Sequence, residues 1–287
     1  MRRIAALVLP FLVVLVPTLP ARAAVTVAFG QGVLTASGDA DADAIVVECV
    51  GGDVRVNGAD PSGGPVGCAS VETILVRGGA GDDRVSLADV ARGDFGRLGR
   101  IFAFGEEGDD TLVGSALSDR LDGGGGTDEL RGGGGADKLL PGGGGGSVLG
   151  GEGRDRVVAV GDGHWTINDD RVAQITPESQ EIRLQSIELA TIIGGSRDNT
   201  ITASTFTGSV VLEGGGGADL LQSGRGRDVL RGGAGDDWLD SGAGNDTLEG
   251  EEGNDVLRGG EGNDRLLGGP GTDTCTTGPG NDSELSC

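Results

Sequence analysis

The sequence predicts an all-β solenoid built from nine-residue, glycine-rich repeats. Three observations support this fold class. Glycine accounts for 60 of the 287 residues, Tyr is absent and Met occurs once, so an ordinary globular core is not expected. A nine-residue period recurs along the chain with Asp in its sixth place. An apolar residue stands two places later, which suits the single inward-facing position of a three-residue strand.

The N-terminus has the features of a secretory signal peptide over residues 1–23. Two arginines precede an apolar run over residues 4–19, and small residues around Ala23 form a cleavage pattern. The run contains Pro10 and Pro17 and is shorter than the roughly 20 residues of a spanning helix, so cleavage is expected instead of a retained anchor.

The chain is strongly acidic. Loss of residues 1–23 removes three arginines and no acid, which changes the net charge from −23 to −26. This charge argues against nucleic acid or anionic lipid as a partner, and it destabilises a compact state unless counter-ions lie close by. A solvated, disordered acidic chain is the alternative, and composition alone leaves both open.

Residues 24–104 form an N-terminal β region with one isolated repeat, residues 78–86, that carries Asp83. Short strands are expected at residues 25–29, 44–49 and 74–76. The alternating Asp and Ala of residues 39–43 suggest an EF-hand loop, but Ala44 and Val50 occupy the places of its glycine and glutamate, so this interpretation is rejected.

The four cysteines fall into two local pairs, Cys49 with Cys68 and Cys275 with Cys287. In an exported protein such pairs predict disulfides that pin the two ends of the fold. Free buried thiols are the alternative. Metal ligation by cysteine is not expected, because the sequence has no C-x-x-C.

Residues 214–287 contain the most regular array, with eight consecutive nonads. Residues 232–240 read G-G-A-G-D-D-W-L-D. The sixth place is always aspartate: Asp219, Asp228, Asp237, Asp246, Asp255, Asp264, Asp273 and Asp282. A disulfide between Cys275 and Cys287 would cap the open end of this array.

Residues 105–158 form an earlier array of six nonads. Gly146 is the exception in the sixth place. The other five nonads carry Asp110, Asp119, Asp128, Asp137 and Asp155 there. Over the fourteen arrayed nonads the fourth place is Gly thirteen times and the eighth is Leu or Val twelve times, and a random glycine-rich linker would not fix three places together.

Each nonad divides into a turn and a strand. Glycine permits unusual backbone angles over the first six residues, and residues seven to nine form a short strand whose eighth residue faces inward. Leu221, Leu230, Leu239, Leu248, Leu257 and Leu266 should therefore stack into one thin core. Two nonads make one coil, so the sixth-place aspartates of nonads n and n+2 should meet.

Two carboxylates and several backbone carbonyls then form an all-oxygen site of the kind Ca²⁺ prefers, whereas Mg²⁺ demands stricter octahedral geometry. The nonads resemble the hemolysin-type, or repeats-in-toxin (RTX), calcium-binding repeat G-G-x-G-x-D-x-U-x. The resemblance implies a parallel β-roll with several calcium ions between successive turns, and an array that orders only when calcium arrives.

The n, n+2 rule gives at most six calcium sites in the second array and four in the first. Residues 114–122 lack the usual glycines and residues 141–149 lack the aspartate, so the pairs Asp119–Asp137 and Asp128–Gly146 should be poor sites. The expected ligands are Asp219, Asp228, Asp237, Asp246, Asp255, Asp264, Asp273 and Asp282, with Asp110, Asp128, Asp137 and Asp155 in the first array.

Residues 159–213 should continue the stack as irregular β-solenoid, with strand-like stretches at 165–167, 181–184 and 187–193 and a decayed repeat at 194–201. A separate ligand-binding insert is the alternative. His164, the only histidine, is expected on a strand surface.

The sequence predicts a secreted, calcium-binding protein that is not an enzyme. It has no H-E-x-x-H and no G-x-S-x-G. A structural or adhesive role, possible cell-envelope or matrix partners, and a location outside the cell or on its surface are expected. A non-catalytic remnant or accessory module of a secreted hydrolase is the alternative. Pore formation is not expected, because no long apolar region follows the signal.

Overall fold

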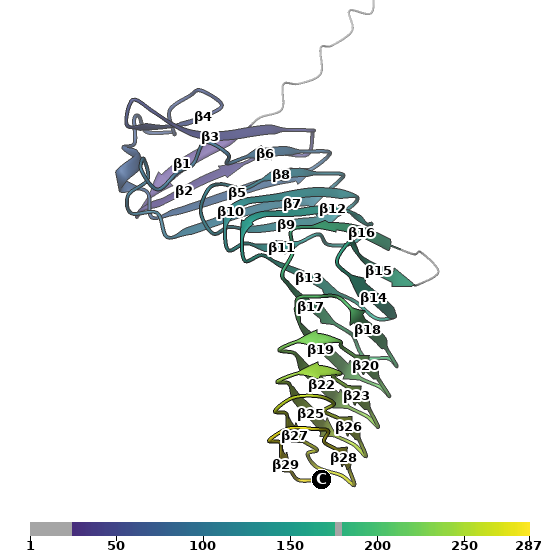
Figure 1. Cartoon of the computed structure of the whole chain (residues 1–287). Coiled ribbons are helices and arrows are strands. Elements are labelled where there is room, and N and C mark those ends of the chain that lie inside the picture. The colour runs from purple at the N-terminus through teal and green to yellow at the C-terminus, as the bar shows by residue number, and fades with distance from the viewer. Residues whose placement is uncertain (1–24, 176–179) are drawn as a thin grey trace, which may run out of the picture.

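The computed structural model describes residues 25–175 and 180–287 and has the predicted architecture, a parallel β-roll (Figure 1). The predicted signal peptide lies outside the described residues. Within the described ranges the single helix is one 3₁₀ turn, η1 (Cys68–Ser70). No helix of this part of the chain is long and apolar enough to cross a membrane.

Two long sheets form the walls of the roll. The first has thirteen strands, which in spatial order are β1 (Thr26–Gly30), β2 (Val33–Ser37), β5 (Thr73–Ala80), β7 (Arg100–Glu107), β9 (Arg120–Gly125), β11 (Lys138–Leu140), β13 (Arg156–Val160), β17 (Leu189–Ile193), β19 (Ser209–Gly216), β22 (Val229–Ala234), β25 (Thr247–Glu252), β27 (Arg265–Leu267) and β29 (Ser283–Leu285).

The second sheet has fourteen strands. From the C-terminal end they are β28 (Thr274–Thr276), β26 (Val256–Arg258), β23 (Trp238–Asp240), β20 (Leu220–Gln222), β18 (Thr200–Thr205), β14 (His164–Asn168), β15 (Arg171–Ile175), β16 (Gln180–Gln185), β12 (Gly146–Gly153), β10 (Asp128–Gly135), β8 (Thr111–Val113), β6 (Arg84–Ser86), β3 (Ala44–Val50) and β4 (Asp53–Val56). A small pair, β21 (Arg225–Gly226) and β24 (Ala243–Gly244), joins two turns.

Successive strands of the arrays alternate between the two sheets, and each pairs in parallel with the strand two nonads away. Leu221 lies opposite Leu239, and Leu239 opposite Leu257, in the second sheet. Leu230 and Leu248 are matched in the same way in the first sheet. The prediction of two nonads per coil is therefore confirmed.

The core is a double row of eighth-place side chains between the sheets. All six leucines predicted to stack are fully buried, and burial of each such side chain stabilises the fold by roughly 1.5–3 kcal/mol. The row ends at the last coil, where Cys275 lies opposite Leu257 and Glu284 lies opposite Leu266.

Both cysteine pairs are disulfides. Cys49 of β3 bonds to Cys68 at the start of η1, with their Cα atoms 6.1 Å apart. Cys275 of β28 bonds to Cys287 beyond β29, with a Cα separation of 5.7 Å. The described residues include no free cysteine. The last two strands are thus joined covalently across the end of the roll.

The stack is irregular between the two arrays. Between β13 and β19 the first sheet has one strand, β17, whereas between β12 and β18 the second sheet has three, β16, β15 and β14. β15 is antiparallel to both of its neighbours. With strands about 4.8 Å apart, two additional strands lengthen one face by roughly 10 Å. Figure 1 shows the stack changing direction at this segment.

Candidate calcium-binding turns

Glycine recurs in the second and fourth places of the turns of the second array, where Glu251 is the one exception. In the nonad 232–240, Gly233 and Gly235 have φ angles of 113° and 137°, in a region that side chains rarely adopt. A Cβ on Gly235 would lie 1.9 Å from the carbonyl oxygen of Gly217 in the turn two nonads earlier. Carbonyl oxygens of one turn therefore lie directly against the glycines of the next.

The sixth-place aspartates meet as the period predicts. The backbone N–H of Asp237 donates to Oδ1 of Asp255 over 2.9 Å, and we call the row of such bonds the aspartate ladder. All six predicted pairs of the second array are joined in this way, at 2.8–3.0 Å: Asp219–Asp237, Asp228–Asp246, Asp237–Asp255, Asp246–Asp264, Asp255–Asp273 and Asp264–Asp282.

The second carboxylate oxygen of these residues is buried and has no hydrogen-bond partner. This holds for Oδ2 of Asp83, Asp110, Asp128, Asp137, Asp155, Asp219, Asp228, Asp237, Asp246, Asp255 and Asp264. Each unsatisfied buried polar group costs about 1–3 kcal/mol, and more when it is charged. The turns therefore require a proton or a cation beside these oxygens.

Burial raises the pKa of these carboxyls. The pKa is about 7 for Asp128, Asp137 and Asp237, and about 6 for Asp110 and Asp246, against an ordinary 3.8. Desolvation is the main cause, and the backbone N–H of the ladder partly offsets it. Neighbouring carboxylates such as Asp219 raise the pKa of Asp237 further. A divalent cation would favour the charged form instead.

The donor set is made of oxygen. Within residues 25–175 and 180–287, no three His, Cys, Asp or Glu side chains gather as a metal-binding group. The oxygen atoms that these turns offer to a cation are those of two carboxylates and of the stacked backbone carbonyls. Hard cations with flexible coordination, above all Ca²⁺, accept this combination.

The first array keeps the ladder in part. Asp110 is bonded to Asp128 and Asp137 to Asp155, both over 2.9 Å. The pair Asp119–Asp137, predicted to be a poor site, is also joined, over 2.8 Å, so the ladder is interrupted only where Gly146 replaces aspartate. Asp119, in a nonad with altered glycines, differs from the others because Ser115 donates its backbone N–H and its hydroxyl to the carboxylate. Hydrogen bonds thus already satisfy the oxygen that the other nonads leave without a partner.

Two further members of the ladder lie upstream of the arrays. The N–H of Asp43 donates to Asp83 over 2.7 Å, and the N–H of Asp83 donates to Asp110 over 2.8 Å. The rejected EF-hand run ends at this Asp43. Gly38, Asp43 and Ile45 hold places one, six and eight of an unrecognised nonad, and that spacing was the signal in the sequence. The nine-residue period does not indicate these two pairs, because Asp43 and Asp83 are 40 residues apart and Asp83 and Asp110 are 27 residues apart, instead of the usual two nonads.

Other residues take the place of aspartate between the arrays. The side-chain oxygen of Asn199 accepts the backbone N–H of Gly163. The backbone N–H of Asn199 in turn donates to Oδ1 of Asp219 over 2.7 Å. Glu188 accepts the N–H of Asp155 over 2.9 Å. The hydrogen-bonded row is thus extended here by a neutral amide and by a longer acid. His164 is exposed on β14, as predicted.

A second ladder, which the sequence did not reveal, runs through the fifth place. The N–H of Asn254 donates to Asp236 and that of Thr272 to Asn254, over 2.8 and 3.0 Å. The opposite turns repeat the pattern from Asn263 to Asn245. These bonds point toward the N-terminus, whereas those of the aspartate ladder point toward the C-terminus, so each stacked turn is held in both directions.

Comparison with protein families agrees with this geometry. A family model described as the RTX calcium-binding nonapeptide repeat (4 copies) matches residues 104–139, 213–248 and 249–284. A search of the curated proteins gives no match. The matched segments contain the turns of the second array and the first four turns of the first array, and repeats of this family bind several calcium ions. The chain therefore contains RTX calcium-binding nonapeptide repeats in both of its arrays, and these repeats form a parallel β-roll.

Proposed function

We propose that this protein is a secreted, non-catalytic β-roll that folds when calcium enters its aspartate ladder, and that it serves a structural or adhesive role. The row of buried Oδ2 atoms without hydrogen-bond partners carries the proposal. The calcium ligands would be the twelve aspartates predicted from the sequence, joined by Asp43 and Asp83.

Each carboxylate has two tasks in this proposal. Its Oδ1 accepts a backbone N–H, which fixes the orientation of the side chain. Its Oδ2 and the carbonyl oxygens of the turn hold the ion, and calcium supplies the positive charge that the buried row lacks. Glycines in places two and four allow the stacked turns to approach closely enough.

Folding on calcium follows from the charge. The full chain carries 45 acidic against 22 basic residues, and its buried carboxyls repel one another until they are neutralised. Extracellular calcium modules bind at about 10⁻⁴ to 10⁻³ M. Such a chain would remain unfolded during export and would order in a calcium-rich exterior.

The central experiment compares two neighbouring single substitutions in the mature chain. Asp237→Asn keeps an acceptor for the ladder but removes the charged Oδ2, so calorimetry should lose the two sites that share it. Asp236→Asn removes the same charge from the exposed fifth place and should bind the full complement. Equal calcium stoichiometry in the two variants would contradict the ligand assignment.

A more severe variant tests the coupling to folding. With Asp237, Asp246, Asp255 and Asp264 all changed to alanine, millimolar calcium should no longer order the second array in circular dichroism. Preserved calcium uptake and an unchanged β spectrum would refute the proposal. Wild-type protein in chelator and in CaCl₂ provides the reference spectra.

The adhesive role needs its own measurement. We expect the calcium-loaded chain to be retained by a cell-envelope or matrix fraction and released by chelator. Retention that ignores calcium would count against adhesion through the β-roll. Hydrolysis of protein or polysaccharide by the purified chain would contradict the non-catalytic assignment.

A further inference from the structure

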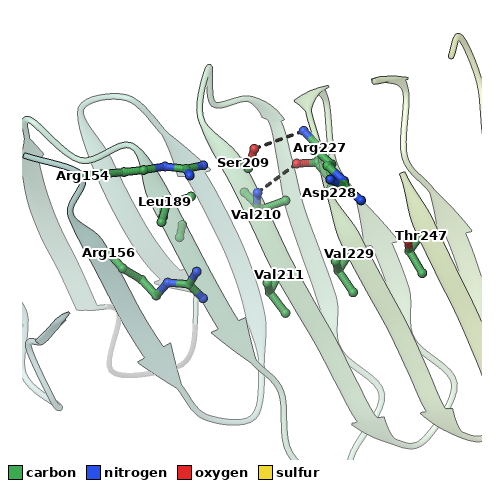
Figure 2. Close-up of a pocket in the computed structure, with 11 residues that line it drawn as sticks. Arg154, Arg156, Leu189, Ser209, Val210, Val211, Arg227, Asp228, Val229 and Thr247 are labelled. Carbon is green, nitrogen blue, oxygen red and sulfur yellow. Dashed lines mark hydrogen bonds between the residues drawn. The ribbon is translucent and has the colours of Figure 1, made fainter. Parts of the chain in front are cut away.

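A groove of about 330 Å³ lies on the outer face of the first sheet where the two arrays meet (Figure 2). Its floor is aliphatic and includes Leu189 of β17 and Val211 of β19. Arg154 and Arg156 extend over the groove from the side of β13, as Figure 2 shows, and Arg227 lines it beside Ser209. Three cationic side chains thus surround one hollow in a chain of net charge −23.

These arginines lack carboxylate partners. Among the described residues, the ion pairs of this protein involve other arginines. The guanidinium of Arg156 donates only to the hydroxyl of Thr191, over 3.1 Å. The one acid that lines the groove is Asp228, which is buried and accepts the backbone N–H of Val210 over 2.9 Å.

Two of the arginines also interrupt the repeat pattern. Arg154 and Arg227 hold the fifth place of their nonads, where Asn245 and Asn263 elsewhere accept the N–H of a later turn. A guanidinium has no acceptor atom, so it cannot continue that ladder. The linker strands bring these two residues, 73 positions apart in the sequence, to one groove.

We propose that this groove binds a tetrahedral oxyanion, the sulfate ester or phosphate ester group of an extracellular molecule. Guanidinium groups match such anions because their planar fork donates two parallel hydrogen bonds. Ser209 accepts the N–H of Arg227 over 3.1 Å, so its hydroxyl hydrogen is free to donate into the groove. The groove shares Asp228 with a calcium-binding turn, but its three arginines give it the opposite charge.

The test is calorimetric titration of the calcium-loaded mature chain with sodium sulfate and, separately, with glycerol phosphate at constant ionic strength. Arg154→Gln combined with Arg227→Gln should weaken binding at least tenfold. Lysine at the same two positions should give an intermediate loss of anion affinity, because lysine keeps the positive charge but lacks the planar, two-pronged guanidinium group. Arg265→Gln, exposed on the same sheet outside the groove, should bind like wild type.

The outcomes are distinguishable. Preferred binding of sulfate identifies a sulfated ligand as the source, and preferred binding of glycerol phosphate identifies a phosphate ester. No binding of either anion, or equal loss in the groove variant and in Arg265→Gln, overturns the proposal. The calcium-induced circular dichroism of each sample is recorded alongside, so a failure of calcium-dependent folding is seen separately from a failure of anion binding.

Discussion

The second array and the linker follow the same coiling rule with different degrees of regularity. From Asp219 to Asp282 every sixth place is aspartate, every parallel pair is two nonads apart, and the aspartate ladder runs through the turns. Between β12 and β18 the second sheet gains two strands, and Asn199 and Glu188 replace aspartates. An arginine-lined groove opens on the first sheet where the linker meets the two arrays. Regular repeats thus concentrate buried negative charge, and their interruption leaves room for positive charge.

The comparison separates two sources of stability. In the linker, large apolar side chains such as Trp165 and Ile167 are buried. In the second array each of the first three coils buries only two leucines, together with two carboxylates that oppose folding when they are ionised. The array should therefore depend on calcium far more than the linker does.

Calcium removal should have the largest effect, and it should fall on the second array. Each site filled at one hundred times its dissociation constant contributes about 2.7 kcal/mol to stability, so loss of several ions should unfold the array. Amide hydrogen exchange measured with and without chelator should show deprotection of residues 214–287 before β14 and β17. Equal loss of amide protection in the second array and in the linker would show that the two regions do not differ in their dependence on calcium.

A glycine substitution in a turn should come next. Gly235→Ala places a Cβ 1.9 Å from a backbone carbonyl at a φ of 137°, and strain of this kind costs roughly 1–3 kcal/mol. Gly216→Ala, in the third place, meets nothing closer than 3.7 Å and should be neutral. Thermal unfolding in calcium compares them, and similar midpoints would show that the turns are looser than the stacking indicates.

The pH dependence should reverse between the calcium-free and the calcium-loaded protein. Folding raises the pKa of Asp237 from 3.8 to about 7, so between these values the folded state keeps a proton that the unfolded chain releases. In chelator, stability should therefore fall as pH rises from 4 to 7.5, by on the order of 1 kcal/mol or more per such carboxyl.

With calcium present, stability should instead rise over the same pH range, because protons compete with the ion for the carboxylates. The folded fraction measured by circular dichroism at pH 5 and pH 7.5, each with and without calcium, tests the reversal. The same slope in both conditions would mean that protons and calcium do not share these groups.

The smallest predicted effect comes from two attempted repairs of the aspartate ladder. Asn199→Asp should add one calcium site beside Asp219, because Asn199 already holds the ladder geometry. Gly146→Asp should fail, since Gly146 has a φ of 124° and its Cβ would lie 2.0 Å from the carbonyl oxygen of Asp128. The number of calcium ions bound by each variant, measured by calorimetry, distinguishes the two outcomes. A gain of one ion in both variants would show that an aspartate in the sixth place creates a site regardless of the backbone conformation.

The sequence predicted those features that the nine-residue period determines. A strict repeat converts directly into strand register, so the leucine rows and the six pairs of the second array could be named in advance. Asp43 and Asp83 were missed as ladder members because loops of other lengths separate them. The groove could not be foreseen either, since it depends on how the linker strands bring Arg154 and Arg227 together.

The two extra strands of the linker change the direction of the stack at a point that is held by strand pairing and not by calcium. β16 is bonded to β12 on one side, β14 to β18 on the other, and β15 joins them through main-chain hydrogen bonds. Loss of calcium would therefore destabilise the second array before it destabilised the linker. A partner that binds both repeat arrays would contact two surfaces held at a fixed angle by the linker. It would gain from bivalent attachment only when the spacing of its own binding sites matches that geometry.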